Sequence, residues 1–264
     1  MLARVKKILG VYRQHGLIGV ARVFRTKIRE IVMLRRIAAA ARRQSEIESL
    51  DKARALADGV NYVYLMAVEG DVAEFGTMTG RSAVALAASV AVNNERHRND
   101  VRGKKRAWFF DSFEGLPEAR FEIDAKSHHV STGLWAPGKC KGLDEGRFAR
   151  LVARYLPRSD FTVLKGWFKD TVPKVDPAAR FAMVHVDGDL YESAIDVLFN
   201  LFERKLVAKG AIIFFDDWDC NAADPEAGER RAWNEAVSRF NIRYSDQGPY
   251  STSCHRFIVH GYGT

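Results

Sequence analysis

Residues 72–80 are Val72-Ala73-Glu74-Phe75-Gly76-Thr77-Met78-Thr79-Gly80, a pattern typical of a buried strand that turns into a helix. Gly76 permits a tight turn, and Gly80 permits a close approach of the backbone where the helix begins near Ser82. The turn lacks the G-x-G-x-x-G spacing of dinucleotide-binding loops, which argues against a nicotinamide-dependent dehydrogenase. An acidic residue two positions before one glycine, with a second glycine after it, is instead the usual form of a methyl-donor loop.

The same alternation of short apolar runs and helical stretches continues along the chain. Strands of four to six residues separated by helices predict an α/β fold with a Rossmann-like, doubly wound, mostly parallel sheet. The expected helices include residues 82–92 and 193–206. The expected strands are residues 72–76, 107–111, 161–165, 182–187 and 211–216, with a closing pair at 242–244 and 255–260.

The positive charge of the chain is concentrated near its N-terminus. The whole sequence carries a net charge of +8, whereas residues 1–45 contain 12 Lys or Arg and one acid, Glu30. We therefore expect residues 1–55 to form a basic helical extension, followed by a catalytic domain over residues 56–264. Because runs of charge are usually solvated faces, packing of this extension on the body or on a second subunit is favoured. Peripheral membrane contact through residues 1–45 is the alternative.

Composition excludes several classes of protein. The sequence is 47% hydrophobic and 28% charged, which is typical of a folded globular protein. No base-reading or aromatic-stacking motif accompanies the basic charge, so we expect no nucleic-acid partner. Cys140, Cys220 and Cys254 are too widely spaced for a zinc motif, and so few cysteines suit the reducing cytoplasm. Neither a signal peptide nor an apolar run of about 20 residues is present, which also favours a cytoplasmic location.

Residues 116–147 are polar, rich in glycine and irregular. A segment of this length inside a compact domain is often a lid or substrate loop, so we expect it to contact the acceptor. His128 and His129 lie in this segment and are candidates for a catalytic base, although an exposed histidine pair is more often incidental. His185, by contrast, lies inside a predicted strand and is expected to be a packed structural residue.

Acidic residues follow three of the predicted strands. Asp111 ends the second strand and is placed to accept hydrogen bonds from both hydroxyls of a ribose, or alternatively to cap the turn at Ser112. Asp187 and Asp189 follow the fourth strand, and Asp216-Asp217 follows the fifth.

Neighbouring strands lie about 4.8 Å apart, so the last four carboxylates converge and repel one another unless a cation joins them. Mg²⁺ prefers such oxygen ligands, and a magnesium site is therefore predicted. The alternative is that one or two of these acids only cap helices, as we expect of Asp189.

Five stretches resemble the metal-dependent macrocin (TylF-like) sugar O-methyltransferases. They are Gly70–Gly76 with Gly80, Phe110–Pro117, Gly166–Thr171, Val186–Ser193 and Gly210–Trp218, and the resemblance covers residues 58 to roughly 240. It implies a class I methyltransferase fold, S-adenosylmethionine as donor, a divalent cation and a sugar hydroxyl as acceptor. The metal ligands that it implies are Asp187, Asp216 and Asp217. The donor-binding residues that it implies are Glu74, Gly76, Gly80, Ser82, Asp111, Ser112, Gly166 and Trp167.

The resemblance weakens in residues 118–147 and in the N-terminal 55 residues, so a macrolide acceptor does not carry over. A surface glycan, a glycolipid or another glycoside fits the motifs equally well. A sugar hydroxyl is a poor nucleophile, so a metal that lowers its pKa and a carboxylate that takes its proton are required. Asp187 is the candidate for both metal ligand and base.

Two other functions remain open at this point. Asp187-Gly188-Asp189 also fits the Asp-x-Asp motif of a metal-dependent nucleotide-sugar glycosyltransferase, although that function leaves Gly76, Gly80 and the second acid pair unexplained. A membrane-associated scaffold without catalytic activity explains residues 1–45 alone.

Overall fold

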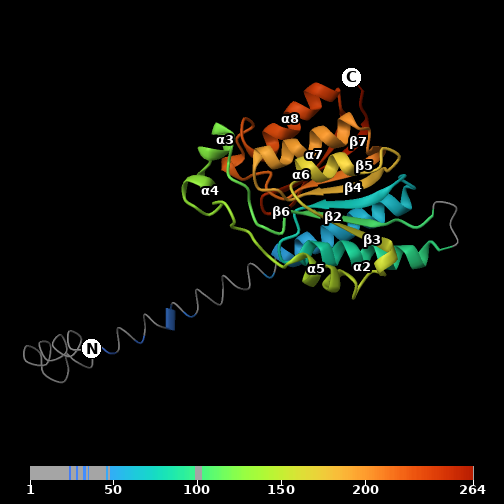
Figure 1. Ribbon diagram of the computed structural model, residues 1–264, viewed down its shortest axis with the longest axis horizontal. Coiled ribbons are helices and arrows are strands. Elements are labelled where there is room, and N and C mark those ends of the chain that lie inside the picture. The colour runs from blue at the N-terminus through green and yellow to red at the C-terminus, as the bar shows by residue number, and fades with distance from the viewer. Residues whose placement is uncertain are drawn as a thin grey trace, which may run out of the picture. The chain divides into compact units, whose positions relative to one another are not determined.

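The computed structural model describes residues 24, 28, 32, 33, 35, 46, 48–98 and 103–263 (Figure 1). It divides the chain into a first unit, residues 1–48, and a second unit, residues 49–264. The described residues of the first unit are helical, and the rest of the predicted basic extension lies outside the described residues. A helix over residues 48–65 buries Ala55, Leu56 and Val60 in the core of the second unit. The boundary predicted after residue 55 therefore falls inside a helix, because the apolar face of that helix already belongs to the catalytic unit.

The second unit is built on a seven-stranded sheet with the order β3-β2-β1-β4-β5-β7-β6. β1 to β5 are parallel, and β7 runs antiparallel between β5 and β6. The chain builds one side of the sheet after β1 and then crosses to the other side with β4, so the order reverses between these two strands. This confirms the doubly wound, mostly parallel sheet. The strands are β1 (Asp71–Phe75), β2 (Ala107–Asp111), β3 (Phe161–Lys165), β4 (Phe181–Val186), β5 (Val207–Phe215), β6 (Arg243–Ser251) and β7 (Cys254–Gly261).

Helices cover both faces of this sheet. Figure 1 shows α6, α7 and α8 on one side and α2 and α5 on the other. All six residues of β4 are buried, as expected for a central parallel strand covered on both faces. The helices are α2 (Arg81–Arg96), α3 (Glu122–Ala125), α4 (His128–Ser131), α5 (Glu145–Val152), α6 (Phe168–Thr171), α7 (Tyr191–Glu203) and α8 (Gly228–Phe240), with 3-10 turns at Arg158–Asp160, Val172–Lys174 and Asn221–Ala223.

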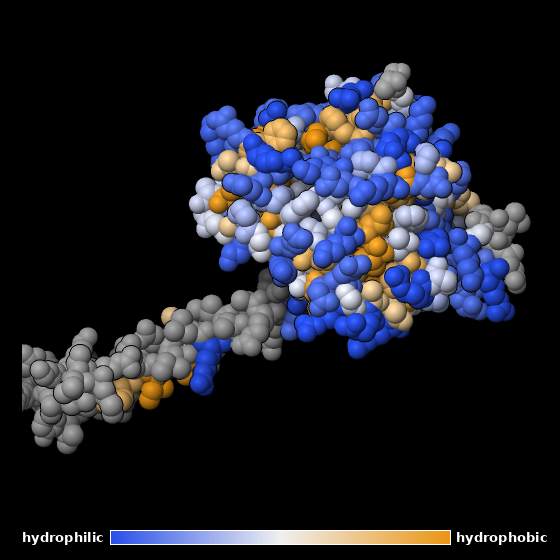
Figure 2. All heavy atoms as spheres, viewed as in Figure 1, coloured by the Kyte–Doolittle hydropathy of each residue, from blue (hydrophilic) through white to orange (hydrophobic). Residues whose placement is uncertain are grey.

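The largest difference from the predicted elements is at the sheet edge. β6 is nine residues long, whereas only residues 242–244 were expected to form a strand. Most of its side chains are exposed or half-buried, so its sequence lacks the apolar run on which the prediction relied. Figure 2 shows the face turned to the viewer, on which hydrophilic side chains predominate and hydrophobic ones gather near the middle.

Candidate active site

A cavity of about 510 Å³ opens at the carboxyl ends of the parallel strands, beside the point where the strand order reverses. Ligands of open α/β sheets bind at this position, and the volume suits a cofactor-sized molecule. The loops after β1, β2 and β3 line one part of the cavity, and the loops after β4 and β5 line another. Residues of the predicted lid, among them Leu116, Glu118, Arg120 and Cys140, also line it.

The structure brings together most of the residues predicted to bind the donor. Gly76, Asp111, Ser112, Gly166 and Trp167 all line the cavity. They come from three different loops, which the parallel sheet places side by side. A ligand in this part of the cavity would therefore contact all three loops at once.

Gly76 is the point at which the donor loop meets the strand that carries the acids. Its φ is +97°, and a Cβ atom there would lie 1.8 Å from the backbone oxygen of Asp187. Backbone hydrogen bonds on both sides hold this approach: Gly76 N donates to Phe110 O at 2.9 Å, and Asp187 N donates to Phe75 O at 2.8 Å. Glycine is therefore required here for close backbone packing as well as for the turn.

Asp111 braces the donor loop from the neighbouring strand. Its Oδ2 accepts hydrogen bonds from Thr77 N at 2.7 Å, Thr77 Oγ1 at 2.8 Å and Met78 N at 3.2 Å. Its Oδ1 accepts from Phe113 N at 2.6 Å, which is the turn-capping role given as the alternative in the sequence analysis. The carboxylate still lines the cavity, so bracing of the loop and contact with a ribose are compatible.

The other predicted donor residues lie outside the lining of the cavity, as far as the chain is described. Glu74 is fully buried, and its Oε1 is 3.0 Å from His185 Nδ1 on the adjacent strand. Gly80 is the N-cap of α2 with φ +80°, and a Cβ atom there would lie 2.9 Å from a methyl group of Leu151. Ser82 is the second residue of α2. The side chain of Glu74 projects from one face of the sheet toward His185, its partner on β4, and contact between Glu74 and the donor remains a proposal.

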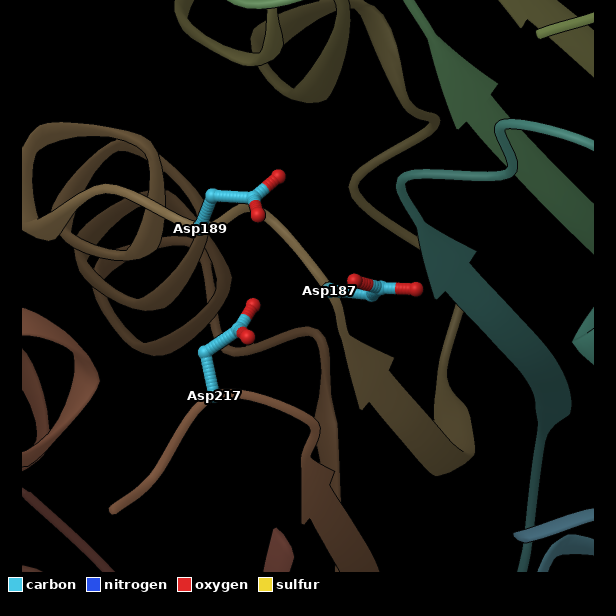
Figure 3. Close-up of side chains that lie close together, drawn as sticks. All are labelled: Asp187, Asp189 and Asp217. Carbon is cyan, nitrogen blue, oxygen red and sulfur yellow. The ribbon is translucent and has the colours of Figure 1, made fainter. Parts of the chain in front are cut away.

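Three of the acids lie close together, but they include Asp189 in place of Asp216, which the resemblance implied as a metal ligand. Carboxylate oxygens of Asp187, Asp189 and Asp217 all lie within 4.8 Å of one another (Figure 3). Asp187 and Asp189 lie in the loop after β4, and Asp217 follows the neighbouring strand β5. Asp189 has φ +59°. The prediction that Asp189 caps α7 is wrong, since Leu190 is the N-cap residue. We call Asp187, Asp189 and Asp217 the acidic trio.

Burial and mutual repulsion oppose ionisation of the three carboxylates of the acidic trio. Burial, followed by the charge of Asp216, raises the pKa of Asp187 well above its ordinary value. Burial and the charge of Asp217 do the same to Asp189. Burial and the charge of Asp216 raise the pKa of Asp217 to about 6. A divalent cation would allow all three to ionise, and their hard oxygen atoms suit Mg²⁺ or a similar ion.

Asp216 lines the same cavity but has other partners. Its Oδ2 lies 2.6 Å from Lys52 Nζ, and its Oδ1 lies 3.7 Å from His185 Nε2. Burial opposes ionisation of Asp216, but His185 and Lys52 outweigh it and hold the pKa of Asp216 below its ordinary value. His185 is the buried residue that was predicted. Burial lowers its pKa, but the nearby carboxylates of Asp216 and Glu74 outweigh this effect and raise the pKa to about 10. His185 therefore lies between two carboxylates, Glu74 and Asp216, that favour its protonated form.

The segment 116–147 is folded against the start of α7. Asp124, only 3% exposed, accepts hydrogen bonds from Tyr191 N at 2.8 Å and Glu192 N at 3.0 Å and so caps that helix. Arg120 Nε lies 3.1 Å from Glu192 Oε2. Leu116, Trp135 and Leu190 form a small apolar cluster between the segment and the loop after β4, which carries Asp187 and Asp189.

The histidines of this segment lie apart from the acids. Within the described chain, neither His128 nor His129 lines the cavity. The ring of His129 stacks on Trp135 with centroids 4.3 Å apart, and burial followed by the charge of His128 lowers its pKa. Trp135 thus fixes His129 in a packing role, and the structure offers neither histidine as a base for the acidic trio.

Sequence reasoning missed Asp189 as a member of the trio, and it missed Lys52 and Asp124 altogether. The signal for Asp189 was present in the Asp-x-Asp spacing. Lys52 and Asp124 had no such signal, because their partners lie 164 and 67 residues away along the chain.

Comparison with known proteins shows similarity to O-methyltransferases. The family model described as "Macrocin-O-methyltransferase (TylF)" matches residues 48–234. A tetracenomycin-C rhamnosyl 4'-O-methyltransferase of Streptomyces olivaceus is 32% identical over 207 residues, which cover 74% of this chain and 64% of that protein. The mycinamicin III 3''-O-methyltransferase of Micromonospora griseorubida is 27% identical over 189 residues, which cover 69% of this chain and 68% of that protein. The chain thus spans slightly less than two thirds of the first of these relatives.

Solved structures show the same fold. The O-methyltransferase NovP has a TM-score of 0.63 and 23% identity, with 79% of each chain covered. The calicheamicin methyltransferase CalS11 has a TM-score of 0.61 and 20% identity, with 78% of this chain and 77% of that chain covered. The fold is therefore that of the class I methyltransferases. No helix in the described part of the chain is both long and apolar enough to cross a membrane.

Proposed function

The chain belongs to the macrocin O-methyltransferase family, and we propose that it transfers a methyl group from S-adenosylmethionine to a sugar hydroxyl with the help of a divalent cation. The observation that carries this proposal is that one cavity holds both the donor loops and the carboxylates. The names of the relatives support a sugar acceptor, since two of them are methyltransferases of sugar hydroxyls on glycosylated natural products.

The donor would lie against the loops after β1, β2 and β3. Gly76 leaves the backbone open at the end of β1, and Asp111 is available to the ribose hydroxyls. Gly166 and Trp167 line the same part of the cavity and are assigned to the adenine. Gly80 and Ser82 remain proposed residues of the donor site through the start of α2, whose position they help to set.

The cation would be held by Asp187 and Asp217. The third ligand is Asp216 according to the resemblance, whereas the geometry of the described chain places Asp189 beside the other two. When bound, a divalent cation lowers the pKa of an acceptor hydroxyl and orients it. The carboxylate of Asp187 is the proposed proton acceptor, and its position is fixed by the backbone contact with Gly76. Transfer forms the oxygen–methyl bond, breaks the sulfur–methyl bond and leaves S-adenosylhomocysteine.

The acceptor would enter between these loops and the segment 116–147. Arg120, Glu118 and Cys140 line that side of the cavity. They lie where the sequence departs from the family, so they are the residues from which a different acceptor specificity is expected. The proposed acceptor class is a glycoside, a glycan or a glycosylated natural product.

The test is transfer of a radiolabelled methyl group from S-adenosylmethionine to a panel of deoxyhexosides, with Mg²⁺ and with a chelator. We expect transfer that requires the metal. In Asp217→Ala we expect nearly unchanged affinity for S-adenosylmethionine and no turnover, because the trio and the donor loops lie at different strand ends. Equal loss of donor affinity and activity would show that Asp217 maintains the fold instead. Titration calorimetry with UDP-sugars tests the glycosyltransferase alternative, for which S-adenosylmethionine would not bind.

The basic segment, residues 1–45, is proposed to support assembly into a homo-oligomer in the cytoplasm. Deletion of residues 1–45 should leave donor binding intact, change the oligomeric state and slow turnover. Sedimentation of both proteins with anionic vesicles, at low and physiological salt, distinguishes assembly from membrane binding. Loss of vesicle binding with an unchanged oligomer would identify the segment as a membrane anchor.

A further inference from the structure

Lys52 is a cation that reaches the candidate metal site from outside the sheet. It lies on the helix over residues 48–65, and its Nζ is 2.6 Å from Asp216 Oδ2. The lysine side chain is 33% exposed and the aspartate side chain is 14% exposed. The ion pair therefore lies at the rim of the cavity, where solvent reaches the lysine.

This ion pair gives Asp216 a positively charged partner, unlike the neighbouring acids. The other oxygen of Asp216 faces His185 Nε2 at 3.7 Å and accepts a hydrogen bond from Tyr250 Oη at 3.4 Å. In contrast, no Lys, Arg or His of the described chain forms an ion pair with a member of the acidic trio. The fixed cations are thus gathered on Asp216, and the trio has no cation of its own.

We propose that Lys52 is a resident counter-cation that competes with the divalent ion for Asp216. The proposal rests on the metal site of the proposed function. In the metal-free protein the ammonium group neutralises Asp216. When the ion binds at the trio, Asp216 turns from Lys52 to the ion, and the ammonium group moves into solvent.

The competition accounts for the two ligand sets inferred above. Asp216 lines the same cavity as the trio and directly precedes Asp217 in the chain, so the ion would compete with Lys52 for its carboxylate. Asp216 would then join Asp187 and Asp217 at the ion, as the resemblance implies, and Asp189 would remain their neighbour. Lys52 also links metal binding to the first helix of the catalytic unit, which no other described ion pair does.

A double-mutant cycle on the full-length protein tests this inference. Binding of Mn²⁺ is measured from the electron paramagnetic resonance signal of the free ion, without donor or acceptor. We expect Lys52→Gln to tighten Mn²⁺ binding by about two- to fivefold, the effect of losing one partly exposed ion pair. In the Asp216→Asn background, Lys52→Gln should have no effect. Lys52→Arg should bind Mn²⁺ as the native protein does, since the competing charge is kept.

Lys169→Gln is the control, because it removes the positive charge of a lysine that itself lines the cavity, whereas Lys52 lies beside the cavity on Asp216. We expect it to change Mn²⁺ affinity less than Lys52→Gln does. Thermal unfolding of every variant identifies any that fail to fold. If Lys52→Gln fails to fold, Lys52→Arg still tests the role of the charge. Unchanged or weaker binding in Lys52→Gln would overturn the proposal, as would equal tightening in the Asp216→Asn background. Absence of Mn²⁺ binding by the native protein would reject the metal site itself and the competition with it.

Discussion

Gly76 and Asp187 are in such close contact that a Cβ atom at position 76 would lie 1.8 Å from the backbone oxygen of Asp187. The donor loop and the acidic trio are therefore parts of one rigid arrangement. The contact exists because β1 and β4 are adjacent parallel strands on either side of the point where the strand order reverses. A change on one side of this contact is expected to disturb the other.

Gly76→Ala should destabilise the protein by about 3 kcal/mol or more, because it combines a backbone clash with a positive φ. Urea denaturation measures the loss. Gly248→Ala is the matched control, since Gly248 has φ +76° and nothing within 4 Å of the added Cβ atom. The control should lose only about 1 kcal/mol. Equal losses in the two variants would show that the contact with Asp187 is not tight in solution.

Asp111→Ala should weaken binding of S-adenosylmethionine and S-adenosylhomocysteine equally, by about 1–3 kcal/mol. Both ligands carry the ribose, and both need the loop that Asp111 braces through Thr77 and Met78. Titration calorimetry measures the two affinities. Asp144→Ala is the control, because it removes a cap from α5 outside the cavity. Unchanged affinity for both ligands in Asp111→Ala would show that the carboxylate serves the turn alone.

Asp124→Ala should loosen the segment 116–147, because it removes both hydrogen bonds to the first residues of α7. We expect a loss of about 1–2 kcal/mol of stability, typical of a lost helix cap. Hydrogen exchange should become faster in this segment and in the first turn of α7. Ser127→Ala removes a cap within the same segment, from the short helix α4, and should leave α7 unaffected. Unchanged exchange in α7 after Asp124→Ala would contradict the capping role.

The pKa of Asp217 predicts how stability depends on pH without metal. Its folded pKa of about 6 lies above the ordinary value of 3.8, so the folded protein holds a proton that the unfolded chain releases. This contribution is complete below pH 3.8 and is lost as the pH rises through 6, with a total of about 3 kcal/mol. Urea denaturation between pH 4 and 8 in a chelator measures it.

Asp217→Asn is the control for this pH dependence. The groups that face Asp217 are Asp187, Asp189, Asp216, Cys220 and Glu229, and they titrate in both proteins. The difference between the native protein and the variant gives the contribution of Asp217 together with its effect on the pKa of Asp187, Asp189 and Glu229. Mn²⁺ should restore stability to the native protein at pH 7.5. An identical slope in the two proteins would show that Asp217 ionises normally.

Local sequence was enough to predict the parts of the site that depend on strand ends. Gly76, Asp111, Asp187 and Asp217 each follow or end an apolar run, and parallel strands bring such positions to one edge. The role of Glu74 was assigned from its motif, but its side chain faces His185 because it lies inside the strand. The Asp-x-Asp spacing placed Asp189 near the other acids, but its membership of the trio depends on a turn with positive φ, which the sequence did not indicate.

The remaining contacts depend on tertiary packing. Lys52 meets Asp216 only after the first helix has packed on the sheet, and Asp124 meets α7 only after the segment 116–147 has folded back. Neither pairing is local, so no periodicity or motif indicates it. The boundary between the two units was expected after residue 55, whereas the structure divides the chain after residue 48, near the start of the helix that packs on the sheet.

In the proposed function, one cavity holds the methyl donor and a divalent cation side by side. The most direct test is a crystal grown with S-adenosylhomocysteine and Mn²⁺, with data collected at the manganese absorption edge. We expect one anomalous peak coordinated by carboxylate oxygens of Asp187 and Asp217, with S-adenosylhomocysteine against Gly76, Asp111 and Trp167. Manganese bound elsewhere, or S-adenosylhomocysteine outside the loops after β1, β2 and β3, would contradict it.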